Sequence, residues 1–218
     1  MSAGAAVGVR AEELTHRYGR RTTGVDGLVF AFEGPGTVAV TGPNGSGKST
    51  LLRIVAGLLR PSEGRATVTV DGRALAPGER RAALGLVTPE LAFYEEFTAC
   101  ENLVFAAESR GLDSPMRAAA DALAAVGLPA RAGDRVAAYS SGMKQRLRLA
   151  FAMLHRPPLL LLDEPGSHLD EEGRTAVREV VARQAGRGLV LLATNDPGEI
   201  QLAERRIELH GHGLGDPA

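Results

Sequence analysis

Two hydrophobic patterns alternate along the chain, and together they predict its secondary structure. Short apolar or alternating runs predict β-strands at residues 7–15, 27–32, 37–40, 66–71, 84–87, 159–162, 189–193 and 206–210. Apolar residues at helical spacing predict a helix after residue 50 and helices at 116–126, 140–154 and 171–184. Four consecutive leucines at 159–162 are typical of a strand that is covered on both faces of a parallel sheet. We therefore predict an α/β protein with a helical insert at residues 89–155.

Composition and charge indicate which classes of protein the sequence can belong to. The chain has 218 residues, of which 44% are hydrophobic and 23% charged, as expected for one folded domain. Its formal net charge of −1 gives no reason to expect nucleic-acid binding. Cys100 is the single cysteine, so no internal disulfide forms and a reducing compartment fits. No apolar run approaches the roughly 20 residues that span a bilayer, so we expect any membrane role to require a partner chain.

Residues 42–50 fit the pattern G-x-x-x-x-G-K-[ST] at every fixed position. A predicted strand precedes this run and a predicted helix follows it, which is the context that the motif requires. Its glycines allow several backbone N–H groups to point at a phosphate chain, and the start of the helix also attracts an anion. We therefore predict a phosphate-binding loop that consists of Gly42, Pro43, Asn44, Gly45, Ser46, Gly47, Lys48, Ser49 and Thr50.

Three side chains in or before this loop suggest how a nucleotide is held. Lys48 is expected to reach the β- and γ-phosphates, and the Ser49 hydroxyl is expected to ligate Mg²⁺. Without a nucleotide, we expect Lys48 to lie in solvent. Tyr18 has two interpretations that its spacing leaves open: an exposed aromatic residue of a turn, or a platform on which an adenine ring stacks. Arg80 and Arg81 are expected to be ordinary charged surface residues.

Two carboxylates follow the leucine strand directly. A carboxylate at the carboxyl end of a parallel strand lies at the ligand crevice of such a sheet. Asp163 suits the coordination of Mg²⁺ through a water molecule. Glu164 is one residue further along and suits the polarisation of the water that attacks the γ-phosphate. These residues predict a hydrolytic site around the phosphate-binding loop.

The order of these motifs resembles the nucleotide-binding subunit of an ABC transporter. The resemblance rests on the loop at 42–50, on Tyr-Ser-Ser-Gly-Met-Lys-Gln-Arg at 139–146 and on Leu-Leu-Leu-Leu-Asp-Glu-Pro at 159–165. It implies an α/β P-loop NTPase core with a mostly parallel sheet, an N-terminal antiparallel β subdomain and a helical insert. The implied division places residues 1–88 and 156–218 in the nucleotide-binding core and residues 89–155 in the helical subdomain.

The resemblance also implies how the parts work together. Residues 139–146 resemble the ABC signature, whose Ser140, Ser141 and Gly142 would offer hydroxyl and backbone donors to the γ-phosphate of the opposite subunit. One loop and one signature in each chain imply a head-to-tail dimer with two ATP molecules at its interface. We expect a homodimer, with a heterodimer of two different cassette chains as the alternative. Tyr18 would then stack on adenine, and Asn195 would occupy the position of a residue that contacts the γ-phosphate.

Several residues depart from the pattern of the family. The signature has Ser141 where the family usually has glycine and Met143 where it usually has glutamine. Pro89 replaces a glutamine that contacts Mg²⁺ and water, with Glu90 one place beyond, and Asn195 replaces a histidine. These departures predict a normal affinity for ATP and slow hydrolysis by the isolated subunit.

The function that the resemblance implies is a motor subunit on the cytoplasmic face of a membrane, where ATP-driven dimer closure moves a separate membrane subunit. We expect that partner to dock near residues 91–103, where Phe93, Tyr94 and Phe97 concentrate. One alternative is a soluble ABC protein that acts as an ATP-gated clamp or assembly factor. Another is a small-molecule P-loop kinase, which the signature and the Asp163–Glu164 pair disfavour.

Overall fold

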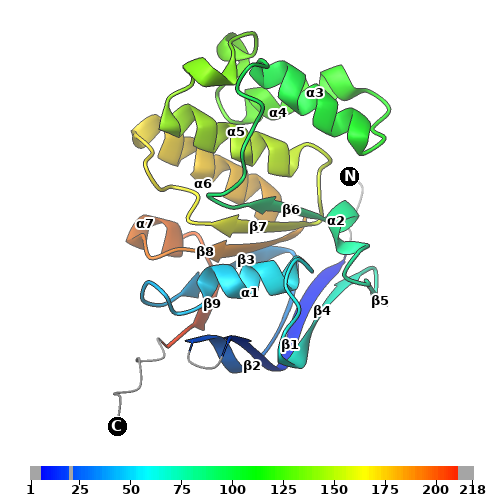
Figure 1. The fold of residues 1–218 in the computed structure, drawn as a ribbon, viewed down its shortest axis with the longest axis vertical. Coiled ribbons are helices and arrows are strands. Elements are labelled where there is room, and N and C mark those ends of the chain that lie inside the picture. The colour runs from blue at the N-terminus through cyan, green and yellow to red at the C-terminus, as the bar shows by residue number, and fades with distance from the viewer. Residues whose placement is uncertain (1–5, 20–21, 211–218) are drawn as a thin grey trace.

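A five-stranded parallel sheet forms the centre of the computed structural model, which describes residues 6–19 and 22–210 (Figure 1). Its strands follow the order β6-β7-β8-β3-β9. They are β3 (Gly36–Thr41), β6 (Leu84–Val87), β7 (Leu159–Asp163), β8 (Leu189–Ala193) and β9 (Arg205–Glu208). Every residue of β3, β7 and β8 is buried, as predicted for strands that are covered on both faces. The strand predicted near residue 206 is the edge strand β9, which pairs with β3.

A second, antiparallel sheet comes from the first part of the chain. Its order is β2-β1-β4-β5, with β1 (Val7–Tyr18), β2 (Thr22–Glu33), β4 (Glu63–Val70) and β5 (Arg73–Ala74). The first two strands are longer than predicted. Their pairing continues beyond a β-bulge-like register shift between Ala11 and Leu14. Tyr18 is therefore the last residue of a strand. The predicted combination of a parallel core, an antiparallel β unit and a helical part is confirmed.

The alternation of side chains along β7 and β8 divides the core into two clusters. Leu161 and Leu191 face helix α1 (Lys48–Val55) and the antiparallel sheet, where Leu51 and Leu52 are fully buried. Leu160 and Leu192 face α6 (Glu171–Ala185) and the helical part of the chain. Figure 1 shows α1 and α6 on opposite sides of the sheet. The same leucine run thus holds the two halves of the molecule together.

The helical part lies beyond α6, at the top of Figure 1. It contains α3 (Ala99–Ser109), α4 (Pro115–Ala125), α5 (Ser141–Met153) and the 3₁₀ turns Pro129–Arg131 and Val136–Ala138. The sequence pattern does not predict α3 as a separate helix. Its start is nevertheless marked in the sequence, because Thr98 and Glu101 form a reciprocal capping box. No helix in the described part of the chain is both long and apolar enough to cross a membrane.

Arg80 corrects one prediction of the sequence. It begins the short helix α2 (Arg80–Ala83) and has 6% of its surface exposed, although it was expected on the surface. Its guanidinium donates to the carbonyls of Ile54, Val55 and Ala66. The last carbonyls of a helix have no partner within the helix, so a buried arginine can satisfy those of α1. Burial lowers the pKa of Arg80 from its ordinary value.

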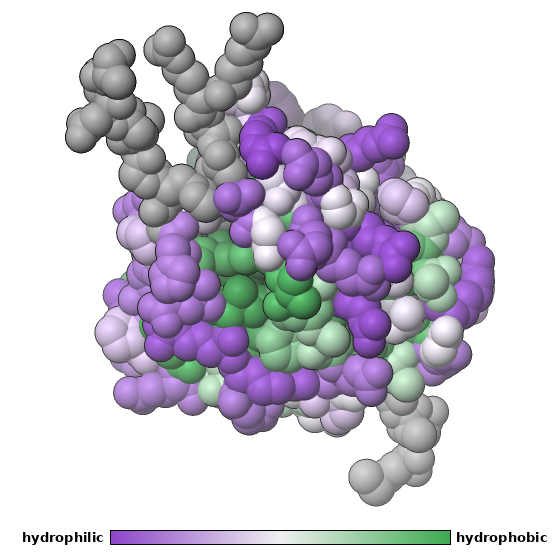
Figure 2. All heavy atoms as spheres, turned by 90° about the horizontal axis from the view of Figure 1, so that it is seen from below, coloured by the Kyte–Doolittle hydropathy of each residue, from purple (hydrophilic) through white to green (hydrophobic). Residues whose placement is uncertain are grey.

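Part of the apolar face of the antiparallel sheet is exposed to solvent along its edge strand β2. Leu28, Phe30 and Phe32 of β2 pack against the core but remain partly exposed, and the two phenylalanine rings lie 5.5 Å apart. Figure 2 views the molecule from below and shows an apolar area framed by hydrophilic residues. The guanidinium of Arg205 lies 5.6 Å from the centre of the Phe32 ring and covers part of this edge.

Candidate nucleotide-binding site

The glycines of the loop between β3 and α1 are required by its conformation. Gly42, Gly45 and Gly47 have φ angles of 147°, 82° and 98°, which favour glycine. A Cβ atom at Gly47 would lie 1.5 Å from the carbonyl oxygen of Gly24, and one at Gly42 would lie 2.3 Å from that of Leu209. The loop is therefore held between β2 and the residues after β9, which fixes the direction of its N–H groups.

Lys48 is buried in this loop, so the expectation that it lies in solvent is wrong. Its side chain is 5% exposed, and Nζ donates to the carbonyl oxygens of Gly42 at 2.8 Å and Pro43 at 3.4 Å. An ammonium group has three donors, and the carbonyls of the curled loop are the nearest acceptors. The Ser46 hydroxyl is also buried and has no partner among the described residues. The loop thus presents a cation and an unpaired donor, which fits the binding of an anion.

Tyr18 lies beside the loop. Its hydroxyl is 3.1 Å from Oγ1 of Thr50, and 44% of the residue surface is exposed. The ring of His16 packs edge-on against it, with 4.6 Å between ring centres. Both interpretations of Tyr18 fit this position, because its ring is exposed and also borders a cleft of about 320 Å³. That cleft is lined by Tyr18, Gly24, Asn44, Gly45, Gly47, Lys48, Ser49, Thr50 and Glu164.

The two carboxylates lie at the end of β7, and Glu164 lines the cleft. Asp163 is the last residue of that strand and is 3% exposed. Burial raises the pKa of its carboxyl above the ordinary value, and a hydrogen bond from the Ser49 hydroxyl opposes that shift. The hydroxyl and the carboxylate are both hard oxygen donors, so together they fit Mg²⁺. Glu164 is half-buried, with a φ of 47°, and its carboxylate accepts from the Ser167 hydroxyl at 3.4 Å.

Asn195 follows β8 and contacts the loop at two points. Its Oδ1 accepts from the backbone N–H of Gly42 at 3.4 Å, and its Nδ2 donates to Oδ1 of Asn44 at 3.3 Å. The residue is exposed. Its amide therefore reaches the phosphate-binding loop but does so with long hydrogen bonds, because the side chain is short.

The three predicted signature residues lie at the start of α5. Ser140 is the N-cap of this helix, and its hydroxyl accepts from the backbone N–H of Met143 at 3.2 Å. Ser141 and Gly142 form the first turn. Among the described residues, the cleft with the phosphate-binding loop includes none of the three. The structure of one chain thus separates the signature from its own nucleotide cleft.

Glu90 has a partner that the sequence does not reveal. Its carboxylate forms an ion pair with Arg53 of α1. A hydrogen bond from its own backbone N–H and the pairing with Arg53 lower the pKa of the Glu90 carboxyl. Glu90 follows Pro89 in a turn where the N–H of Leu91 donates to the Thr88 carbonyl at 3.2 Å. The carboxylate one place beyond Pro89 is therefore engaged with a cation of α1.

A chain of hydrogen bonds, also missed by the sequence patterns, joins two parts of the site through α5. Gln145 is 6% exposed, and its Nε2 donates to the Pro165 carbonyl at 3.1 Å. Arg148 donates from Nη1 to Oε1 of Gln145 at 2.9 Å and from Nε to the Leu91 carbonyl at 2.8 Å. Because Pro165 follows Glu164 directly, this Gln145–Arg148 bridge links the segment at Leu91 to the loop with the candidate base.

Comparisons with known proteins indicate the family of this chain. A family model described as ABC transporter matches residues 25–167. The linearmycin resistance ATP-binding protein LnrL of Bacillus subtilis (strain 168) is 34% identical over 191 residues, which cover 86% of this chain and 60% of LnrL. The uncharacterized ABC transporter ATP-binding protein YybJ of the same strain is 32% identical over 197 residues, which cover 89% of this chain and 88% of YybJ. This chain therefore spans less than two thirds of LnrL and most of YybJ.

A solved structure gives the same fold. The ATP-binding cassette MJ0796, in a dimeric post-hydrolysis state bound to ADP and phosphate, superposes with a TM-score of 0.82 at 24% identity. The match covers 92% of this chain and 94% of the MJ0796 chain. Since the family model covers more than half of the chain and a relative of similar length shares about a third of its residues, the chain belongs to the ABC transporter family.

Proposed function

We propose that this chain is the ATP-hydrolysing motor subunit of a transporter, acting with Mg²⁺ at the cytoplasmic face of a membrane to drive a separate membrane subunit. The observation that carries this proposal is one cleft lined by Tyr18, by Glu164 and by most of the phosphate-binding loop, in a chain of this family. Co-purification from membranes with an untagged integral-membrane protein tests it. A chain that stays soluble and ATP-competent, with no such partner, would favour the alternative of a soluble ATP-gated clamp.

Each group in the cleft has a proposed role. Tyr18 stacks on adenine, and Lys48 moves from the carbonyls of Gly42 and Pro43 to the β- and γ-phosphates. Ser49 binds Mg²⁺ directly and Asp163 does so through water, and the ion would neutralise charge on the phosphate oxygens. Glu164 orients and polarises the attacking water. The remaining residues of the loop contribute backbone N–H groups to the phosphates.

We further propose that ATP closes two copies of the chain into a head-to-tail dimer. The separation of Ser140, Ser141 and Gly142 from their own cleft supports a role at the cleft of a second chain. The start of α5 would direct its N–H groups at that γ-phosphate, while Ser140 keeps its capping bond or exchanges it for the phosphate. The dimeric state described for MJ0796 is consistent with this arrangement. A partner cassette of different sequence is the alternative to a homodimer.

The isolated subunit is expected to hydrolyse ATP slowly, because Asn195 and Pro89 replace two groups that position the reaction. Replacing Asn195 with histidine should raise the steady-state ATPase rate several-fold, since histidine offers a donor that can carry charge. Asn195→Gln is the matched control, because it lengthens the side chain without adding a charge. A parent enzyme that turns over at about ten per second or faster and gains nothing from histidine would contradict this expectation.

The proposed docking site for the membrane subunit lies near residues 91–103, in the helical subdomain that we assign to residues 89–155. Tyr94 and Phe97 are 56% and 45% exposed, and their rings lie 5.4 Å apart. Phe105 of α3 extends this group, with its ring 6.0 Å from that of Tyr94 and 52% exposed. Phe93 instead packs against Phe151 of α5, so its main contribution is to the fold. Three neighbouring exposed aromatic rings support an interface anchor.

Charge reversal tests this surface. Changing Glu95 and Glu96 to lysine should reduce co-purification of the membrane subunit, while ATP binding in solution persists. Part of the effect will come from the lost ion pair between Glu95 and Lys144, which has an N–O distance of 2.5 Å. The double variant Tyr94→Ala with Phe97→Ala removes the anchor without that pair, and the exposed Glu179→Lys serves as a control. If both double variants retain the partner, the docking surface lies elsewhere.

A further inference from the structure

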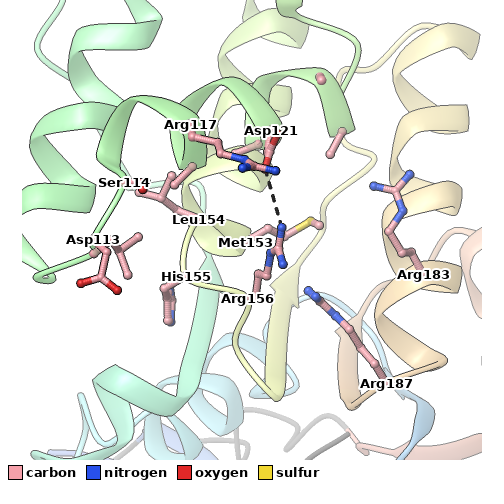
Figure 3. Close-up of a pocket in the computed structure, with 15 residues that line it drawn as sticks. Asp113, Ser114, Arg117, Asp121, Met153, Leu154, His155, Arg156, Arg183 and Arg187 are labelled. Carbon is pink, nitrogen blue, oxygen red and sulfur yellow. Dashed lines mark ion pairs between the residues drawn. The ribbon is translucent and has the colours of Figure 1, made fainter. Parts of the chain in front are cut away.

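A hollow of about 880 Å³, whose lining Figure 3 shows, shares no residue with the nucleotide cleft. Its walls come from α4, from the residues that follow α5 and from the end of α6. Arg156 and Arg187 precede β7 and β8, whereas Asp163 is the last residue of β7 and Asn195 follows β8. Because the strands are parallel, the hollow lies at the amino ends of β7 and β8 and the nucleotide cleft lies at their carboxyl ends. The hollow is thus separate from the nucleotide cleft on which the proposed function rests.

Positive charge gathers in this hollow. Its lining includes four arginines and two aspartates: Arg117, Arg156, Arg183, Arg187, Asp113 and Asp121. Asp121 is shared between Arg156 at 3.6 Å and Arg117 at 4.0 Å. Arg183 has no ion pair among the described residues, and Nε of Arg187 donates to the neutral Gln184 amide at 2.9 Å. Figure 3 shows Arg156, Arg183 and Arg187 extending toward the same space.

These guanidinium groups line the same hollow, so their charges affect one another. Burial lowers the pKa of Arg187, and the charges of Arg156 and Arg183 lower it further. Such repulsion costs free energy unless a counter-charge is present. Of the two aspartates in the lining, Asp121 is already divided between Arg117 and Arg156, and Asp113 forms no ion pair with these arginines among the described residues. An anion placed among the three guanidinium groups would therefore relieve the repulsion.

The other walls are apolar and have a size suited to a small molecule. They consist of Leu112, Ala118, Ala122, Ala125, Met153 and Leu154. Small-molecule sites usually measure about 300–1,000 Å³ and combine apolar walls with a few converging polar groups. His155 adds no charge at neutral pH, because burial and the nearby Arg110 lower its pKa to about 4. Apolar walls beside converging guanidinium forks suit an organic body with an anionic head.

We propose that this hollow binds a phosphate-bearing organic anion, with Arg183 and Arg187 as its principal contacts and Arg156 as a third. Each guanidinium offers paired N–H donors that match a phosphate group, and three of them match its tetrahedral oxygens and double charge better than they match one planar carboxylate. The apolar wall of α4 and Met153 receives the organic part of the ligand.

Calorimetric titration with 1-naphthyl phosphate tests this site, because the probe joins an apolar body to a phosphate. The same titration of Lys48→Ala separates the two sites, because this variant loses the cation of the nucleotide cleft and leaves the hollow unchanged. The native chain should bind the probe, and Arg183→Ala with Arg187→Ala should weaken binding by at least about tenfold, given the usual strength of hydrogen bonds to charged groups. Arg183 is exposed, so the single variant Arg183→Glu should fold even if the double variant folds poorly, and it should abolish binding of the probe. Arg65→Ala, on the outer face of β4, should change nothing.

Three results would overturn the proposal. Binding that is unaffected by the arginine variants would place the probe elsewhere. Equal binding of 1-naphthol would show an apolar hollow with no preference for phosphate. Binding to vesicles that contain phosphatidic acid, without binding of 1-naphthyl phosphate in solution, would assign the arginines to a membrane surface instead. Replacing Arg183 and Arg187 with lysine separates charge from geometry: weaker binding of the probe supports recognition by the guanidinium forks.

Discussion

Replacing Glu164 with glutamine should reduce the ATPase rate by about 10²-fold or more, while ATP affinity changes little. Glutamine keeps the shape of the side chain and a hydrogen bond to Ser167, but its amide cannot polarise the attacking water. Because ATP then persists, the variant should accumulate as an ATP-bound dimer. Single-turnover hydrolysis and light scattering measure the two effects.

Glu96→Gln is a suitable control for this experiment, since Glu96 is exposed and outside the cleft. Its ATPase rate should match that of the parent. A Glu164→Gln variant with the parent rate would show that another group performs the role of base. A variant that hydrolyses slowly but remains monomeric with ATP would leave the base assignment standing and argue against ATP-driven closure.

Replacing Lys48 with alanine should weaken ATP binding by at least about tenfold, because charge-assisted contacts to the phosphates are lost. The structure adds a second effect. Lys48 donates to two carbonyls of the loop, so its removal also leaves the Gly42 and Pro43 carbonyls without this partner. The loop should therefore become more mobile in hydrogen exchange even without ATP.

Lys144 provides a matched control, because Lys48 and Lys144 are the two lysines of the chain. Lys144→Ala removes the same charge but lies on α5, where it pairs with Glu95. It should bind ATP like the parent. Equal ATP affinities for Lys48→Ala and the parent, measured by calorimetry, would refute the assignment of the phosphate-binding loop.

The sequence predicted those parts of the fold and site that depend on short, regular patterns. The leucine strand and the loop at 42–50 specify both the strand–loop–helix unit and the two carboxylates at its side. Tyr18 could be placed near the loop, but its two interpretations could not be separated, because stacking on a ligand and simple exposure need the same exposed ring.

Residues whose partners are distant in sequence could not be predicted in the same way. From the sequence, Arg80 and Lys48 are predicted to be exposed to solvent, because charged residues usually are. Arg80 is instead buried against backbone carbonyls 14 to 26 positions away, and the curl of the loop folds Lys48 back onto nearby carbonyls. The Arg53–Glu90 pair likewise forms only when α1 and the turn at Pro89 meet. The arginines of the hollow converge from three separate elements.

The Gln145–Arg148 bridge has a mechanical consequence. Three hydrogen bonds in series connect the Leu91 and Pro165 carbonyls, and a displacement of about 1 Å at either end would stretch at least one of them beyond normal length. Arg148 is partly buried, and this burial lowers the pKa of its guanidinium. Half-broken arrangements are therefore costly. The proposed docking surface near residues 91–103 and the loop with Glu164 should consequently shift as one rigid unit, or separate in a single step.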